Sequence, residues 1–145
     1  MKYFGYGSNL WLEQMAFRCP EHRVLGLGRL QGYRWFISSR GYANIAVSAD
    51  DFVLGLVFEI SQSDEKSLDK YEGVHRGLYR KENLPVLIGN ESLDCLVYVD
   101  PVEEEGRPKA EYIARINKGI RDAKLPLEYV ERCIRKYVPA SAEAD

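Results

Sequence analysis

Residues 2–10, KYFGYGSNL, begin as a short strand and end in a turn that leads directly into the helical pattern WLEQMAF. Gly5 and Gly7 remove side chains from one face of the strand, so another backbone or a ligand can approach closely. Ser8 or Asn9 is a suitable N-cap for the helix that follows. A strand that passes into a helix in this way gathers several backbone N–H groups at one point, as anion sites and ordinary helix starts both do.

The composition is that of one globular domain. Its 145 residues suffice for a single hydrophobic core. The formal net charge is −2, and no basic cluster indicates a nucleic-acid or anionic-membrane partner. No apolar run approaches the ~20 residues that a membrane span needs, and the first residues do not form a signal peptide. We therefore expect no nucleic acid and no membrane among the partners.

The cysteines and histidines are isolated from one another. Cys19, Cys95 and Cys133 form no CxxC pair, and without an export signal they indicate the reducing cytoplasm rather than a disulfide framework. His22 and His75 lie too far apart in the sequence to predict a zinc site. We expect a cytoplasmic protein that holds no metal.

Strands are expected to outnumber helices and to alternate with them only in part, which is typical of an α+β domain. The expected strands are residues 2–7, 28–38, 43–49, 52–61, 79–89 and 92–100. The last two form a hairpin that turns at Gly89 and Asn90, and Pro85 places its strand at an edge. The expected helices are residues 10–17, 61–73, 110–123 and 125–138. Residues 1–138 are predicted to form one domain and residues 139–145 a flexible tail.

Glu72 occupies a position that is unfavourable for stability. It follows Leu68 by four residues on the helix expected over residues 61–73, so it points inward or to the rim of the core. It also lies in the last turn, where the helix dipole disfavours a carboxylate. Burial and the dipole both raise its pKa, and a carboxyl group with a raised pKa can exchange protons near neutral pH.

Each of these features also has a structural explanation. Glu72 could pair with Arg76 or Arg80 at the surface, and the sequence physics alone favours this simpler role. Turns such as GYGSN are mostly structural. Ser8 lies in no GxSxG elbow and has no His–Asp set beside it, so no nucleophile is predicted. Three tyrosines are half-buried packing residues by default: Tyr79, Tyr112 and Tyr129.

Three motifs together resemble the γ-glutamylcyclotransferase family. They are YFGYGSNL at residues 3–10, LDKYEGVHRGLYRK at residues 68–81 and LPLEYVERC at residues 125–133. The first motif is shared by a wider superfamily, whereas the other two are narrower. The resemblance spans nearly the whole chain, and Gly5 stands where a small residue such as alanine is frequent.

The resemblance implies a small mixed β-barrel-like sheet flanked by helices, with the active site at one barrel mouth. It implies release of 5-oxoproline from a γ-glutamyl compound without a cofactor, and Glu72 as the catalytic acid and base. The substrate-binding loop implied by the first motif consists of Tyr6, Gly7, Ser8, Asn9 and Leu10. The residues that match pocket tyrosines of the family are Tyr79, Tyr112 and Tyr129.

The chemistry of this reaction fits the residues. The α-amine of the substrate attacks its own γ-carbonyl carbon, so holding the chain curled supplies much of the catalysis. One carboxylate with a raised pKa can take the proton of the α-ammonium and protonate the leaving amine. Backbone N–H groups at the GYGSN turn can stabilise the oxyanion or hold the α-carboxylate.

Two classes of function remain open from the sequence. The first is the cyclotransferase, and the second is a binding module of the same fold that holds a small γ-glutamyl ligand without turnover. Retention of Glu72 favours the enzyme, because a buried carboxylate does not help to bind an anion. The leaving group is an amino acid, the side-chain amine of γ-glutamyl-lysine, or an acylated carrier in a biosynthetic pathway. The oligomeric state is open between a monomer and a homodimer.

Overall fold

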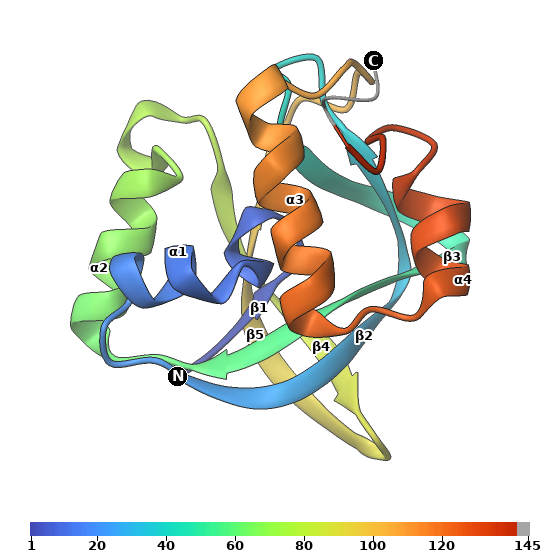
Figure 1. Cartoon of the computed structure of the whole chain (residues 1–145). Helices are drawn as coiled ribbons and strands as arrows, with labels where there is room; N and C mark the ends of the chain where they lie inside the picture. The colour runs from blue at the N-terminus through green and yellow to red at the C-terminus, as the bar shows by residue number, and fades with distance from the viewer. Residues whose placement is uncertain (142–145) are drawn as a thin grey trace.

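The computed structural model describes residues 1–141, and its centre is a closed five-stranded β-barrel (Figure 1). The strands are β1 (Lys2–Gly5), β2 (Arg23–Ile37), β3 (Ala43–Glu59), β4 (Arg80–Ile88) and β5 (Glu91–Val99). They follow one another around the barrel in the order β1-β3-β2-β4-β5. Neighbouring strands are antiparallel except β1 and β5, which pair in parallel at Tyr3 and Leu96 and close the barrel. The predicted α+β fold with a barrel-like mixed sheet is therefore confirmed.

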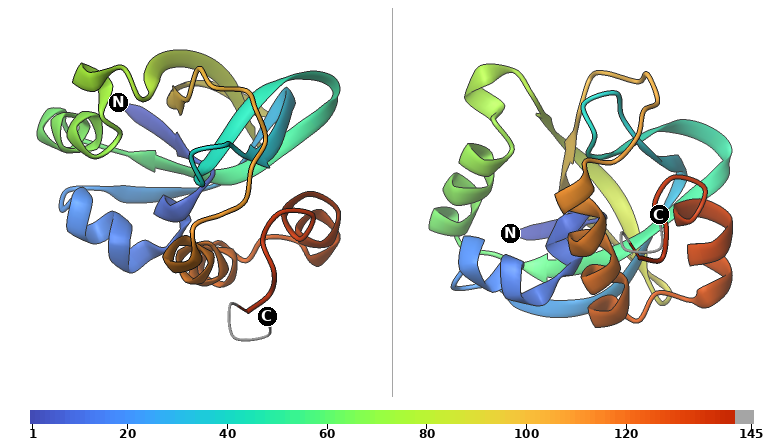
Figure 2. Two further views of the ribbon diagram at one scale, coloured as in Figure 1. Left: turned by 90° about the horizontal axis from the view of Figure 1, so that it is seen from above. Right: turned by 45° about the horizontal axis from the view of Figure 1, so that its top comes forward.

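The helices pack on the outside of the barrel. They are α1 (Leu12–Arg18), α2 (Gln62–Tyr71), α3 (Ala110–Ala123) and α4 (Leu127–Tyr129), which continues as a π-helical turn over Val130–Ile134. Figures 1 and 2 show α1 and α2 together on one side, α4 on the other, and α3 between them. Two 3-10 turns, Ser8–Leu10 and Val74–Arg76, lie before α1 and after α2.

Local sequence signals account for the ends of several elements. The Ser61 side chain accepts a hydrogen bond from the Asp64 N–H, and the Asp64 carboxylate accepts one from the Ser61 N–H, so a capping box starts α2. Gly73 adopts the left-handed conformation after the helix, at φ 64°. The hairpin of β4 and β5 turns at Gly89, also at positive φ, as predicted.

Other boundaries differ from the prediction. The two strands expected at residues 43–49 and 52–61 are one continuous strand, β3. Residues 48–51 have no partners on β2, because four residues of β3 bulge opposite Gly32 of β2. The polar side chains there resembled a turn, but the strand runs through them. Pro85 does not mark an edge, since β4 lies between β2 and β5 in the closed barrel, although β4 pairs with β2 only at Leu87.

The barrel interior and the helix interface form one core. Phe4, Phe36 and Phe58 are fully buried within it. Gly55 is required where β1 lies against β3, because a side-chain carbon there would collide with the Gly5 carbonyl oxygen. Absence of a side chain at this crossing allows the small barrel to close.

The C-terminal end lies only partly within the described residues. The Pro139 carbonyl accepts a hydrogen bond from the Asn117 side chain, which ties the start of the predicted tail to α3. Residues 142–145 of that tail lie outside the described residues. Over residues 1–141, no helix has the length and apolar character to span a membrane. Nor do these residues contain a cluster of three or more His, Cys, Asp or Glu side chains suited to a metal.

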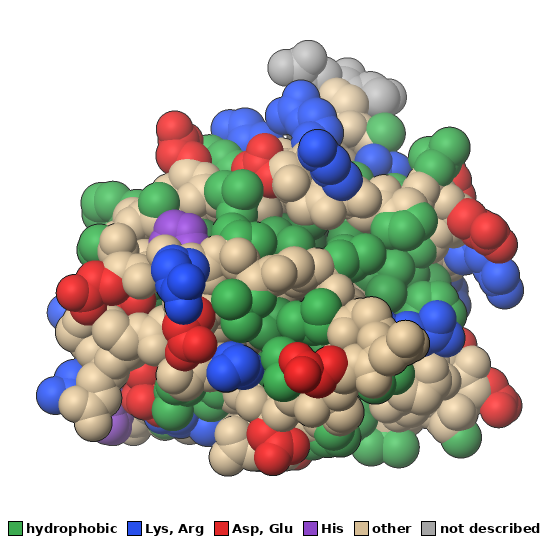
Figure 3. Space-filling view, turned by 90° about the horizontal axis from the view of Figure 1, so that it is seen from below, with side chains coloured by type: hydrophobic (Ala, Val, Ile, Leu, Met, Phe, Trp, Pro, Cys, Tyr) green, Lys and Arg blue, Asp and Glu red, His purple; other side chains and the backbone are tan. Residues whose placement is uncertain are grey.

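Part of the molecular surface is apolar. Figure 3 shows hydrophobic side chains across the middle of one face, with charged side chains around them. On β2 and β4, the exposed apolar residues are Val24, Leu25, Leu27 and Leu87. No described residue identifies a partner for this surface, and the homodimer stays a prediction.

Candidate active site

A pocket of about 300 Å³ opens at one mouth of the barrel. At this end β1, β2 and β5 finish and β3 and β4 begin, so the connecting segments converge. The residues that the sequence placed together line it as follows: Tyr6, Gly7, Ser8, Asn9, Glu72, Tyr79 and Tyr112. The pocket therefore brings most of the predicted site residues to one place.

Hydrogen bonds fix the turn after β1 at the pocket floor. The Tyr6 hydroxyl donates to the carbonyl of Tyr98 at 2.6 Å, and the indole N–H of Trp35 donates to the Tyr6 carbonyl at 2.9 Å. Both bonds are buried, and together they connect the turn to β5 and β2. A buried polar group with a satisfied bond holds a unique conformation, so the turn is rigid at this point.

The side chains of Ser8 and Asn9 hold the turn rather than cap the helix. The Gln14 amide donates to Ser8 Oγ at 2.8 Å and to Asn9 Oδ1 at 2.9 Å. The Asn9 amide donates to the Tyr3 hydroxyl at 2.9 Å. The prediction of a side-chain N-cap at these positions was wrong, because α1 starts after Trp11 and has no side-chain cap. The 3-10 turn between β1 and α1 could not be read from the sequence.

Gly7 lies against the wall of the pocket. A side-chain carbon at this position would lie 3.0 Å from the Tyr112 hydroxyl and 3.1 Å from Cβ of Ala43. Ala43 is also the bonding partner of two pocket tyrosines, since its N–H donates to the Tyr112 hydroxyl and its carbonyl accepts from Tyr79. The backbone of the turn therefore approaches the tyrosines closely because position 7 has no side chain.

Leu10 and Tyr129 are not among the residues that line the pocket. Leu10 is fully buried and packs where Gly119 of α3 lets the two backbones meet. It anchors the turn on α3 rather than facing the cavity. Tyr129 is buried against Phe52 on β3, with ring centroids 5.9 Å apart. The expectation that Tyr129 lines the pocket with the other tyrosines is not met.

Glu72 follows the last residue of α2 and faces the pocket, half-buried. Burial raises the pKa of its carboxyl group to about 7, while the charge of Arg18 lowers it. No hydrogen bond or ion pair from within residues 1–141 reaches the carboxylate. Arg80 pairs with Glu82 instead, so the surface ion pair considered for Glu72 does not form with that residue. A carboxyl group that titrates near pH 7 in a pocket suits proton transfer.

The pocket tyrosines stay protonated at neutral pH. Burial raises the pKa of Tyr3, Tyr6 and Tyr79 well above the usual value, and that of Tyr112 to about 12. The Tyr3 and Tyr112 oxygens each accept an N–H bond, from Asn9 and Ala43. Each of these two hydroxyl groups keeps its own proton to donate toward the cavity.

Comparison with known proteins relates this pocket to a family. A family model described as AIG2-like matches residues 52–133. Proteins named gamma-glutamylcyclotransferase from Homo sapiens and Mus musculus are 33% and 32% identical to this chain over 141 residues. Each alignment covers 90% of this chain and 75% of the relative.

This chain belongs to the AIG2-like γ-glutamylcyclotransferase family. A solved structure named gamma-glutamyl cyclotransferase is 31% identical, with a TM-score of 0.84, and the match covers 91% of this chain and 85% of that one. An uncharacterised Homo sapiens protein of known structure is 32% identical, with a TM-score of 0.82, over 90% of this chain and 84% of that one. The γ-glutamylcyclotransferase fold therefore extends over nearly all of the chain.

The sequence analysis did not identify several residues of this γ-glutamylcyclotransferase pocket: Tyr3, Arg18, Arg40 and Tyr98. Tyrosines within strands ordinarily indicate the core, and these two are indeed almost fully buried. The arginines reach the pocket from α1 and from the turn between β2 and β3. Only the closure of the barrel brings those segments together, so no local pattern signals them.

Proposed function

We propose that this chain is a γ-glutamylcyclotransferase that converts γ-glutamyl compounds into 5-oxoproline and a free amine. One observation carries the proposal. The Glu72 carboxyl group, whose pKa is raised to about 7, shares a tyrosine-lined pocket with the turn that carries the YGSN motif. The family relationship supports the same reaction, since the named relatives are gamma-glutamylcyclotransferases.

The reaction starts with proton removal. The α-amine of a γ-glutamyl compound is an ammonium at neutral pH and cannot attack until it loses a proton. The ionised Glu72 carboxylate accepts this proton, and a pKa near 7 makes the transfer efficient at the working pH. The free amine then attacks the γ-carbonyl carbon of the same molecule. Because nucleophile and electrophile are already connected, enclosure of the curled substrate provides the remaining advantage.

Negative charge then develops on the γ-carbonyl oxygen. The candidate donors are the backbone N–H groups of the turn at residues 7–9 and the hydroxyl groups of Tyr3 and Tyr112. Donors held in place before the reaction stabilise such an oxyanion without reorganisation. The Tyr6 hydroxyl is less suited, because it already donates to the Tyr98 carbonyl.

The leaving amine departs as the carbonyl re-forms. Protonated Glu72 donates its proton to the departing nitrogen, and the bond between this nitrogen and the γ-carbon breaks. After the attack the ring nitrogen still carries a second excess proton. Glu72, ionised again, takes up this proton and passes it to the released amine, so two protons in all move from the α-nitrogen to the leaving nitrogen and Glu72 ends in its starting state. The products are the five-membered lactam and the leaving group as its ammonium, and the balance requires no cofactor.

The proposed setting of the enzyme is the cytoplasm, with a small γ-glutamyl molecule as its partner. Three free cysteines support a reducing compartment: Cys19, Cys95 and Cys133. Their pKa values are raised by burial, which keeps the thiols unreactive.

The proposal is tested by 5-oxoproline release from γ-glutamyl-alanine, γ-glutamyl-lysine isopeptide and a γ-glutamylated carrier analogue. Release from any of the three supports the cyclotransferase and identifies its leaving group. Ligand binding without release from all three would contradict turnover and support the binding module instead.

A further inference from the structure

The pocket carries more positive than negative charge. Four arginines line it, Arg18, Arg40, Arg76 and Arg115, against a single acidic side chain, Glu72, as far as the described residues show. Near pH 7 Glu72 is only partly ionised. Arg40 and Arg115 have carboxylate partners, Asp100 and Glu111, yet the remaining two arginines still outnumber Glu72. The γ-glutamyl group does not require this excess of cations, since it has one α-carboxylate and one α-ammonium and no net charge.

Three of these arginines are poorly suited to bind a ligand, because Arg18 and Arg115 bind other side chains and Arg76 is exposed at the surface. Arg18 donates to Asn9 Oδ1 at 3.2 Å and lies over the Tyr71 ring at 4.4 Å. Arg115 pairs at 2.6 Å with the exposed carboxylate of Glu111 on the same helix. Arg76 is exposed and makes no ion pair with any described residue. Exposed side chains of this kind are mobile and contribute little directional binding.

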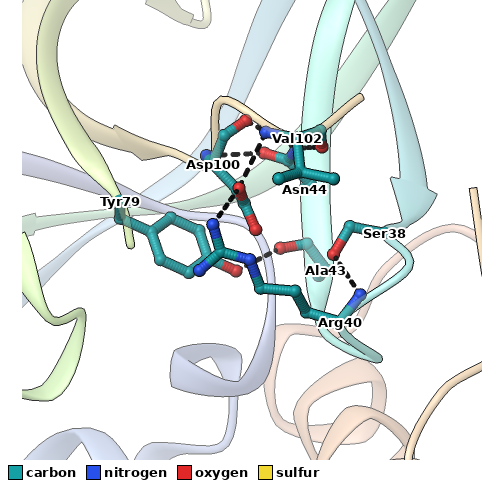
Figure 4. A network of polar contacts seen from close by, with 7 residues as sticks. All are labelled: Ser38, Arg40, Ala43, Asn44, Tyr79, Asp100 and Val102. Atoms are coloured by element: carbon teal, nitrogen blue, oxygen red, sulfur yellow. Dashed lines mark hydrogen bonds and ion pairs between the residues drawn. The ribbon is translucent and has the colours of Figure 1, made fainter. Parts of the chain in front are cut away.

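Arg40 differs, because a buried carboxylate holds it. Its guanidinium pairs with Asp100 Oδ1 at 3.3 Å, and the Asp100 side chain is only 1% exposed. Figure 4 shows the Arg40 guanidinium reaching from its turn toward the Tyr79 ring, next to Asp100. Within residues 1–141 this guanidinium, which has five N–H donors, makes one ion pair.

The position of Asp100 is itself fixed by hydrogen bonds. Its Oδ1 also accepts from the Val102 N–H at 2.8 Å, and its own N–H donates to Asn44 Oδ1 at 2.9 Å. The Asn44 amide donates back to the carbonyl groups of Asp100 and Val102 (Figure 4). This network ties the end of β5 to the start of β3, so Arg40 is aimed from a rigid base.

We propose that Arg40 binds a carboxylate of the leaving group and that Asp100 positions it, which makes Arg40 a specificity-determining residue for γ-glutamyl-amino acids over neutral or cationic γ-glutamyl amines. The inference rests on the cyclotransferase function proposed above. A guanidinium fork matches a carboxylate in shape and charge, and one that is held in place loses little entropy on binding.

The depth of the pocket assigns Arg40 to the leaving group rather than to the γ-glutamyl group. The floor is almost fully buried and consists of residues such as Tyr3, Tyr6 and Tyr98. The γ-glutamyl group must lie there, because its amine and carbonyl need the turn and Glu72. Arg40 has a side chain that is 30% exposed, so it belongs to the rim through which the leaving group emerges.

The test compares two substrates that differ only in the carboxylate of the leaving group. These are γ-glutamyl-alanine and γ-glutamyl-alaninamide, and the measured quantity is the ratio of their kcat/KM values for 5-oxoproline release. We expect the protein to favour the acid on the order of tenfold, the value of one charge-assisted hydrogen bond at a partly exposed site. Loss of protein through poor folding cancels from this ratio.

The decisive variant is Arg40→Gln combined with Asp100→Asn, which removes the cation without leaving an unpaired buried charge. We expect its ratio to fall to about one-tenth of the starting value, in line with loss of that hydrogen bond. Arg40→Lys keeps a cation beside Asp100 but lacks the fork, and Asp100→Asn alone frees the guanidinium. Both variants are expected to reduce the ratio partly, mainly by raising the KM for γ-glutamyl-alanine. They therefore provide the test if the double variant does not fold.

Arg132→Gln is the matched control, because Arg132 is 77% exposed on the π-helical turn and pairs with Glu128, far from the residues that line the pocket. It is expected to keep the ratio. Equal rates for the two substrates, or a ratio that survives in both Arg40 variants, would overturn the inference while leaving the cyclotransferase intact. If neither substrate released 5-oxoproline, the proposed function would fail and this inference with it.

Discussion

Burial raises the pKa of Glu72 to about 7, and the charge of Arg18 acts against this shift by lowering the pKa. Arg18 is held in this position by Asn9 of the turn after β1 and by the Tyr71 ring. The same turn that is proposed to hold the substrate therefore also places the cation that tunes the proposed acid and base.

This relationship predicts the pH dependence of turnover. For the unmodified protein, kcat/KM should rise with pH up to a midpoint near 7, because the free enzyme needs an ionised Glu72. In Arg18→Gln the midpoint should move to higher pH, since the opposing charge is gone. Arg18→Lys retains the charge and serves as the control. A profile that is flat between pH 6 and pH 8, or a midpoint that Arg18→Gln leaves in place, would exclude Glu72 as the titrating group.

The stability of the protein should also depend on Glu72 and on pH. The native state binds this proton more tightly than the unfolded chain, whose glutamate titrates near 4.5, so native stability falls as the pH rises from 4.5 to 7. Ionisation of Glu72 does not lower the free energy of unfolding at low pH. Above pH 7 it lowers this free energy by up to about 3 kcal/mol. Glu72→Gln mimics the neutral form and should therefore stabilise the protein at pH 8 much more than at pH 5.

Chemical denaturation at the two pH values measures this difference. Glu59→Gln is a useful comparison, because the N-terminal ammonium lowers the pKa of Glu59. Removal of the Glu59 carboxylate should therefore destabilise the protein at pH 8. A Glu72→Gln variant less stable than the parent at pH 8 would show that the carboxylate makes favourable contacts in the native state.

Gly7→Val should weaken ligand binding more than folding. The added methyl groups must displace Tyr112 or Ala43, or enter the pocket. Calorimetric titration with 5-oxoproline should give a Kd raised on the order of tenfold, the equivalent of one lost hydrogen bond. Gly7→Ala adds one carbon, at 3.0 Å from the Tyr112 hydroxyl, so its Kd for 5-oxoproline should lie between those of the unmodified protein and Gly7→Val. Unchanged affinity in a folded Gly7→Val protein would mean that the turn only starts the helix.

Glutathione is expected to be a poor substrate. Its leaving group is a dipeptide, which moves the terminal carboxylate one residue, about 3.5 Å, beyond that of γ-glutamyl-alanine. A guanidinium fixed by Asp100 cannot follow it over that distance. Under identical conditions, kcat/KM for glutathione should be at least about tenfold below that for γ-glutamyl-alanine, as for a lost charge-assisted contact. Equal efficiency with both would refute this account of specificity.

Much of the fold could be predicted where the signal is local. Gly89 and Asn90 mark a hairpin because few other residues fit that turn, and Ser61 with Asp64 starts α2 through contacts three residues apart. The spacing of Leu68 and Glu72 likewise placed the glutamate at the core rim. These features depend on neighbours in the sequence, which the sequence itself displays.

Features that depend on distant segments could not be predicted. Arg40 and Asp100 meet only because β2 and β5 finish at the same mouth of the barrel. Asp50 and Asp51 read as a turn, yet β3 bulges there without ending, since long twisted strands absorb extra residues. Tyr129 fitted a family motif, but its placement against Phe52 follows from packing of α4 on β3.

The central claim is that Glu72 transfers the protons of a cyclisation, and Glu72→Gln tests it most directly. The glutamine keeps the shape of the side chain but cannot exchange protons, so 5-oxoproline release from γ-glutamyl-alanine should fall by ~10²–10⁴-fold. The titration with 5-oxoproline should still show binding, which separates lost chemistry from a lost pocket. Turnover within threefold of the unmodified protein, in a folded variant, would contradict the account.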